Sequence, residues 1–178
     1  PSQARKHQFL KADWLDTPSG SMRAIASRDA LYLLEFIDRP ALPNEIERLK
    51  QLTSSEIIFG RNPVIDQLGQ ELAAYFAGGK RLFLTPLAEF GSLFTRKVWD
   101  ALRAIPAGEV RSYSALAADI GQAPASRAVA RANGANQISI LIPCHRVIGA
   151  DGSLTGYGGG LWRKRWLIEH ERRMALSR

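Results

Sequence analysis

The chain has 178 residues, of which 46% are hydrophobic and 23% charged, a composition that excludes a disordered chain. No apolar run reaches the roughly 18 residues that a membrane helix needs, and no basic and then apolar leader opens the sequence. One cysteine excludes an internal disulfide framework, which indicates a reducing compartment. Because only three histidines accompany that cysteine, we do not expect a structural zinc site.

The positive charge is confined to the second half of the chain. The formal net charge is +7, yet residues 1–94 carry 11 basic and 11 acidic side chains. Residues 95–178 carry 13 basic and 6 acidic side chains. This asymmetry is typical of a protein that binds a polyanion, although a merely soluble basic surface would give the same count.

The first half predicts a small scaffold of strands and helices without a catalytic constellation. Short polar and Gly- or Pro-containing turns separate three predicted strands, which form a meander. Apolar spacing behind Pro43 predicts a short helix, and Asn62-Pro63 predicts the start of a longer one that ends at Gly78-Gly79. The predicted strands cover residues 14–16, 21–26 and 30–37, with an edge strand over 56–59.

After a link over residues 82–91, the pattern changes to short helices, predicted over 94–105, 113–120 and 125–132. A turn over residues 121–124 joins the last two, as in a helix-turn-helix, although many helix pairs of this kind do not bind DNA. The predicted helix over residues 125–132 carries few large side chains. Its small side chains would let the backbone approach a nucleic acid closely, but alanine also simply favours helix. Its residues include Ser126, Arg127, Ala128, Ala130 and Arg131.

The segment 140–148 places Cys144 beside His145, after an apolar run that predicts a buried strand ending at Pro143. A free thiol with a pKa of about 8.5 is a poor nucleophile near neutral pH, and a nearby imidazole can accept its proton. Adjacency in sequence does not establish such a pair, because a lone cysteine after an apolar strand is often a packed small hydrophobe.

Two later segments strengthen the catalytic interpretation. The glycine-rich loop over residues 152–160 lets backbone groups approach a flat ligand, and Tyr157 could stack on it. A basic helix over residues 161–173 then brings Glu171, a carboxylate that could orient an imidazole. The three side chains would form a Cys–His–Glu set from separate parts of the chain.

Together these segments resemble the O6-alkylguanine-DNA alkyltransferases, the methylated-DNA–protein-cysteine methyltransferases. The close resemblance runs from about Phe94 to Glu171, and the first half resembles only the layout of that family's smaller domain. The matching runs, in order, are Val110-Arg111-Ser112-Tyr113, Ser126-Arg127-Ala128-Val129, Asn136, Ile142-Pro143-Cys144-His145-Arg146-Val147, Gly156-Tyr157 and Leu167-Ile168-Glu169-His170-Glu171.

The resemblance implies the roles of the reacting residues. Cys144 would accept the alkyl group, His145 would draw its proton through a water, and Glu171 would hold the imidazole. Asn136 would tie the helix-turn-helix to the active-site segment. Tyr113 would crowd the rotated phosphate and offer its hydroxyl to the flipped guanine.

The resemblance also implies a DNA surface and a base pocket. Arg127 would enter the duplex where the damaged nucleotide leaves, on a helix face that includes Ser126, Ala128, Ala130 and Arg131. Ala130 stands where the family often has glycine. Val147, Tyr157 and Gly158 would line the pocket, with the carbonyls of Cys144 and Val147 receiving the guanine amino group and the Gly158 backbone facing the alkylated oxygen. The family often carries a small polar residue in place of Gly158.

The overall expectation is an α+β chain with a small N-terminal α/β domain over residues 1–87, built on a short antiparallel sheet with helices. A mainly helical C-terminal domain over 88–178 would contain the helix-turn-helix and the acceptor cysteine. The family would transfer one alkyl group per molecule, irreversibly, from O6-alkylguanine or O4-alkylthymine after base flipping. The resemblance implies double-stranded DNA as partner and no cofactor or metal. We expect a monomer in a bacterial or archaeal cytoplasm, or in the nucleus of a eukaryote.

Three other classes of protein stay open from the sequence. A lesion-binding protein of the same fold would lack the acceptor cysteine, which is present here. A cysteine hydrolase would use the same Cys, His and Glu side chains for acyl transfer. A helix-turn-helix regulator would bind a specific operator and leave its thiol unreactive.

Overall fold

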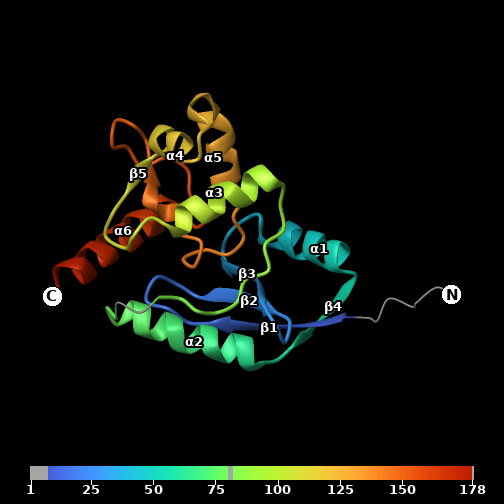
Figure 1. Ribbon diagram of the computed structural model, residues 1–178. Coiled ribbons are helices and arrows are strands. Elements are labelled where there is room, and N and C mark those ends of the chain that lie inside the picture. The colour runs from blue at the N-terminus through green and yellow to red at the C-terminus, as the bar shows by residue number, and fades with distance from the viewer. Residues whose placement is uncertain (1–7, 80–81, 178) are drawn as a thin grey trace.

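A computed structural model describes residues 8–79 and 82–177. Figure 1 shows a small sheet with α2 below it, α1 at its right and the helices of the second half of the chain above it. The α+β prediction is confirmed. No helix in these two described ranges is long and apolar enough to cross a bilayer.

The sheet has four strands in the order β3-β2-β1-β4. The predicted meander is confirmed, and β4 is an edge strand as predicted, but the first strand begins at Gln8 rather than Trp14. The prediction of an antiparallel sheet is wrong in one pair, because β4 runs parallel to β1. The helix α1 crosses between β3 and β4, and a helical crossover delivers the next strand in the parallel direction. The strands are β1 (Gln8–Leu15), β2 (Met22–Ala26), β3 (Leu31–Phe36) and β4 (Ser55–Phe59).

Two helices cover the two faces of this sheet. Helix α1 (Leu42–Thr53) buries Leu42 and Leu49 on one face. Helix α2 (Pro63–Phe76) packs on the other face, and its start is fixed as predicted, because the Asn62 side chain accepts a hydrogen bond from the Ile65 amide at 3.0 Å.

The second half of the chain is mainly helical. The predicted short helices are present with shifted ends, and the turn between α4 and α5 holds a short 3-10 helix, Ala123–Ala125. A two-stranded parallel ladder joins β5 to β6. The elements are α3 (Leu93–Arg103), β5 (Arg111–Ser112), α4 (Tyr113–Asp119), α5 (Ser126–Gly134), a 3-10 turn (Cys144–Arg146), β6 (Val147–Ile148) and α6 (Leu161–Leu176).

The predicted strand over residues 140–142 is wrong. These residues are buried, but they form tight turns, with the Leu141 amide bonded to the Ser139 carbonyl at 2.9 Å and the Ile142 amide bonded to the Ile138 carbonyl at 3.1 Å. Ile140 has a φ of 73°, in the left-handed region that a β-branched residue seldom adopts. Burial alone therefore explains the apolar run.

The two halves of the chain are joined along β3. The amide of Leu34 donates to the Gln137 carbonyl at 2.8 Å, and the amide of Ser139 donates to the Leu34 carbonyl at 2.9 Å. The amide of Leu31 likewise donates to the Pro86 carbonyl at 2.8 Å. The main hydrophobic core continues from α2 into α3 and α5. The segment just before the cysteine is thus fixed to the N-terminal sheet, and the division at residue 87 stays a prediction.

Candidate active site

Cys144 is the first residue of the 3-10 turn that follows Pro143, and 6% of its surface is exposed. It lines a cavity of about 460 Å³ whose walls also come from the start of α4, the end of α5 and the segment after it, the glycine-rich loop and the turn after β3. We call this the acceptor cavity. Its lining residues are Arg39, Tyr113, Ala130, Asn133, Gly134, Asn136, Ser139, Cys144, Thr155, Gly156, Tyr157 and Gly158.

Two asparagines fix the backbone around the cysteine. The Asn136 side chain donates to the Ile142 carbonyl at 2.8 Å and accepts from the Ile138 amide at 2.9 Å, so it clamps the turns that precede Cys144. The Asn133 side chain, which the sequence did not single out, donates to the Cys144 carbonyl at 3.3 Å. That carbonyl is one expected to receive the guanine amino group. Both asparagines are buried.

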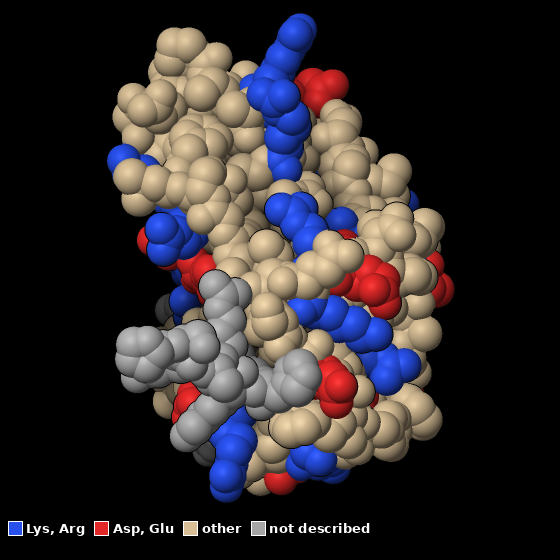
Figure 2. Space-filling model, turned by 90° about the vertical axis from the view of Figure 1, so that its right-hand side faces the viewer, with Lys and Arg blue, Asp and Glu red and all other residues tan. Residues whose placement is uncertain are grey.

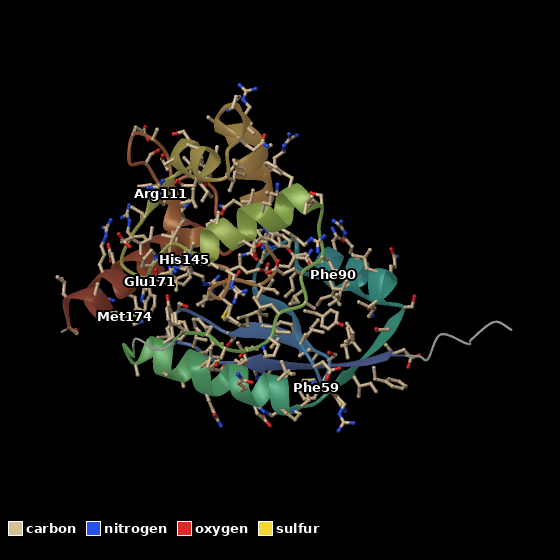
Figure 3. The ribbon with its side chains drawn as sticks, viewed as in Figure 1. Phe59, Phe90, Arg111, His145, Glu171 and Met174 are labelled. Carbon is tan, nitrogen blue, oxygen red and sulfur yellow. The ribbon has the colours of Figure 1, made fainter. Side chains whose placement is uncertain are left out.

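His145 and Glu171 lie together where α6 passes the 3-10 turn (Figure 3). His145 Nε2 is 2.8 Å from Glu171 Oε2, and the two side chains are 0% and 1% exposed. Within residues 8–79 and 82–177, His145 Nδ1 has no hydrogen-bond partner. A buried imidazole with one nitrogen held and the other unpartnered is suited to accept a proton, directly or through a water.

The carboxylate of Glu171 has two further partners that the sequence analysis missed. Arg146 donates to both of its oxygens, from Nε at 2.8 Å and from Nη2 at 2.9 Å. The Tyr75 hydroxyl, from α2, donates to Oε2 at 2.7 Å. Burial works against the charged form, but His145 and Arg146 outweigh it and hold the pKa of Glu171 well below its usual range. The carboxylate therefore stays ionised and can hold the imidazole.

The thiol of Cys144 needs such a base. Burial raises its pKa to about 11, although the Asn136 side chain and the cations of Arg39 and Lys164 counteract part of this shift. The neutral thiol is therefore the resting form at pH 7, and a thiolate forms only when its proton is removed within the site.

Lys164 and Tyr113 both bind the carbonyl of Thr155, a residue that lines the acceptor cavity. Lys164 Nζ donates to the Thr155 carbonyl at 2.8 Å, and burial lowers its pKa to about 8. The Tyr113 hydroxyl donates to the same carbonyl at 3.2 Å. The hydroxyl expected to reach the guanine thus donates a hydrogen bond to the glycine-rich loop.

The predicted pocket residues are only partly brought together. Tyr157 and Gly158 line the acceptor cavity, but Val147 is fully buried in β6 and does not. The loop ends at Gly160, whose φ of 93° suits glycine where α6 begins. The described residues contain no group of three or more His, Cys, Asp or Glu side chains that could hold a metal ion.

Helix α5 presents Ala130 to the acceptor cavity and its arginines to solvent. Ala130 lines the acceptor cavity, Ser126 and Ala128 are half-buried, and Arg127 and Arg131 are exposed. On the face in Figure 2, Lys and Arg side chains follow one another from the top of the molecule, where Figure 1 places α5, to its centre.

The N-terminal half also supplies a residue to the cavity, Arg39, which the sequence analysis did not select. Arg39 lines the cavity, and its Nη1 lies 2.5 Å from the Oε2 of the fully buried Glu35. The Ser139 hydroxyl donates to the other oxygen of Glu35 at 2.8 Å.

Comparisons with known proteins agree with this geometry. Residues 93–173 match the family model described as the DNA-binding domain of 6-O-methylguanine DNA methyltransferase. The chain is 43% identical over 167 residues to a methylated-DNA–protein-cysteine methyltransferase of Salmonella typhimurium, covering 91% of this chain and 95% of that protein.

Solved structures give the same result. A crystal structure of Mycobacterium tuberculosis O6-methylguanine methyltransferase superposes with a TM-score of 0.76 at 39% identity, covering 96% of each chain. The structure of Mycobacterium tuberculosis OGT in complex with DNA superposes with a TM-score of 0.75 at 39% identity, covering 93% of this chain and 94% of that one.

Proposed function

The chain belongs to the methylated-DNA–protein-cysteine methyltransferase family, and on that premise we propose that Cys144 takes the alkyl group directly from O6-alkylguanine in duplex DNA. The transfer repairs the base without excising it, and O4-alkylthymine is a second possible substrate. The observation that carries the proposal is the buried Cys144 at the acceptor cavity, with its sequence neighbour His145 bonded to the buried carboxylate of Glu171.

The chemistry is a single displacement. His145 takes the thiol proton through a water that bridges Sγ and the unpartnered Nδ1, and Glu171 stabilises the resulting imidazolium. The thiolate attacks the alkyl carbon in line, so a carbon–sulfur bond forms as the carbon–O6 bond breaks. Guanine leaves with the electron pair, and a proton returns to it. The thioether product has no activated carbonyl for water to attack, so each molecule reacts once.

The damaged base must leave the duplex to reach the cavity, because the O6 atom is inaccessible within the base stack. The bare face of α5 lets the helix approach the DNA backbone, and exposed Arg127 fills the space that the nucleotide vacates. The arginines on this surface neutralise phosphates. Tyr113 then turns from Thr155 toward the extruded base. We infer that the protein acts as a monomer in a bacterial cytoplasm.

The deciding experiment is intact mass followed by peptide mapping, after mixing the protein with duplex DNA containing O6-methylguanine. We expect the mass gain of one methyl group replacing the thiol proton, confined to Cys144 and saturating at one per chain. The variant Cys144→Ala keeps the cavity and is expected to bind the duplex without gaining mass. No gain with the lesion still bound would indicate a lesion-binding protein. The absence of both a mass gain and lesion binding would favour the hydrolase or the regulator.

The role of α5 has its own test. Arg127→Ala should slow repair of duplex DNA by about tenfold or more, while the reaction with free O6-benzylguanine stays within twofold, because only the duplex requires extrusion. Arg111→Ala, which removes an exposed arginine paired with Asp119 instead, is the matched control. Equal slowing on both substrates would contradict this role for Arg127.

A further inference from the structure

We propose that Arg39, in the turn after β3, is a specificity-determining residue. Together with Gly158 it limits the size of the alkyl group that the acceptor cavity can receive. The inference rests on the proposed function, since it concerns the alkyl group transferred to Cys144. It assigns a substrate-selecting role to a residue of the N-terminal half.

The first observation is where the guanidinium is anchored. Arg39 lines the same cavity as Cys144. Its Nη2 donates to the Gly134 carbonyl at 3.1 Å, and its Nη1 donates to the Asn136 carbonyl at 3.2 Å. The guanidinium therefore lies against the wall formed by the end of α5 and the segment after it.

The second observation is what it meets on the opposite wall. A Cβ atom at Gly158 would overlap the Arg39 guanidinium and lie 2.8 Å from Nη1, closer than real Cβ contacts come. The φ of Gly158 lies outside the left-handed region, so the backbone there does not itself require glycine. Gly158 thus leaves room for the guanidinium, which fills the place where a side chain would stand.

The third observation is that the guanidinium is held firmly. Only 14% of the Arg39 side chain is exposed, and Nε also pairs with Glu45 Oε1 at 3.3 Å. If Arg39 swung away, Oε2 of the fully buried Glu35 would lose its hydrogen-bond donor, and an unsatisfied buried oxygen is costly. A bulky alkyl group therefore cannot easily displace the guanidinium.

These contacts place a fixed, flat cation between two walls of the acceptor cavity. An alkyl group on its way to Cys144 occupies the same cavity, so it must fit in the space that Arg39 leaves. A methyl group adds one carbon to the base, whereas a benzyl group adds a ring that must share this space with the guanidinium. Removing Arg39 should widen the cavity and favour the larger group.

The test compares single-turnover alkylation of Cys144, followed by intact mass, on two duplexes that contain O6-methylguanine or O6-benzylguanine. We expect Arg39→Ala to raise the benzyl-to-methyl rate ratio by about tenfold or more, the range that small volume changes in a binding pocket produce. Arg39→Lys, which keeps a long cationic side chain, should restore most of the wild-type ratio. Arg48→Ala, which removes an exposed arginine of α1, is the matched control and should not change the ratio.

A double-variant cycle tests the contact itself. Gly158→Ala should lower the melting temperature in the wild type but not in Arg39→Ala, because the clash then disappears. In the double variant, the new methyl group should also bring the rate ratio partly back toward the wild-type value. If Arg39→Ala does not fold, Glu35→Gln combined with it removes the unpaired carboxylate, and the same ratio is measured.

Two results would overturn the size limit: an unchanged benzyl-to-methyl ratio in folded Arg39→Ala, or strictly additive melting temperatures in the cycle. Failure of the proposed function looks different. In that case neither the wild type nor any variant transfers a methyl or benzyl group. The Arg39–Gly158 coupling would still appear in the melting temperatures.

Discussion

Two buried carboxylates, one from each half of the chain, lie against arginines, yet their pKa values shift in opposite directions. Glu35, in β3, is fully buried beside Arg39, and burial raises its pKa from 4.5 to about 8 despite that cation. Glu171, in α6, is 1% exposed beside Arg146, and its pKa is held well below 4.5. Burial disfavours ionisation of both, so the difference comes from the partners.

The two carboxylates differ in how many partners they have and in whether another acid shares those partners. Glu171 receives two hydrogen bonds from Arg146, a third from Tyr75, and pairs with His145. Glu35 shares its one arginine with Glu45, a second acid that raises the pKa of Glu35 further.

Arg39 also donates hydrogen bonds to two backbone carbonyls. A carboxylate is therefore stabilised only where the donors around it are not shared with another acid. The C-terminal cluster keeps a permanent charge beside His145, and the N-terminal cluster holds the Arg39 side chain in place.

The largest effect is expected where the C-terminal cluster is broken. Glu171→Gln leaves the guanidinium of Arg146 buried without a counter-charge, so the free energy of unfolding should fall by about 3–5 kcal/mol. Transfer should slow by at least about 100-fold, because the imidazole loses the group that holds it. Guanidinium denaturation and single-turnover kinetics measure the two effects.

The control for this variant lies two residues away. Glu169 is exposed on the same helix, and Glu169→Gln should change neither quantity measurably. Equal losses of stability and transfer rate in both variants would contradict a specific contribution from the buried network around Glu171. The wild type should also lose stability as the pH falls below about 4.5, since the stabilisation from a carboxylate with a depressed pKa is complete above its unfolded pKa and declines as the pH falls toward its folded pKa.

A smaller effect is expected from the one N-terminal contact in that cluster. Tyr75→Phe removes the hydroxyl that donates to Glu171 at 2.7 Å but keeps the ring, which packs against Phe76, Phe83 and His170. We expect a loss of about 2 kcal/mol in the free energy of unfolding, typical of a hydrogen bond to a charged group. Chemical denaturation measures it. In the Glu171→Gln background the same change should cost clearly less, and a full cost there would show that the hydroxyl acts elsewhere.

The sequence predicted the C-terminal cluster better than the N-terminal one for a physical reason. Cys144, His145 and Glu171 lie in short motifs in which a nucleophile, a base and a carboxylate can be recognised from the residue types alone. Tyr75 lies among apolar residues of α2 at core spacing, and its partner is 96 positions away, so nothing local distinguishes it from a packed ring. Arg39 lies in an ordinary turn, and the carbonyls that it binds are 95 and 97 positions away.

The fold shows the same division. The helix that Asn62 caps was predictable, because its start signal is local. The parallel direction of β4 was not, since it depends on where α1 carries the chain. The apolar run ending at Ile142 indicated burial correctly, but burial alone does not distinguish a strand from the turns that the Asn136 side chain holds.

The smallest effect is expected at Glu35, and its sign is opposite to that at Glu171. Because the pKa of Glu35 is about 8 in the folded protein and near 4.5 when exposed, the unfolded chain releases this proton first. Stability from this group is therefore complete below pH 4.5 and is lost as the pH rises toward 8. Glu35→Gln cannot ionise, so the variant should lack this decline. The difference should be about 1 kcal/mol, because relaxation and water entry around a buried ion reduce the penalty. Urea denaturation of both proteins between pH 5 and 8 measures it, and parallel profiles would show that Arg39 keeps Glu35 ionised after all.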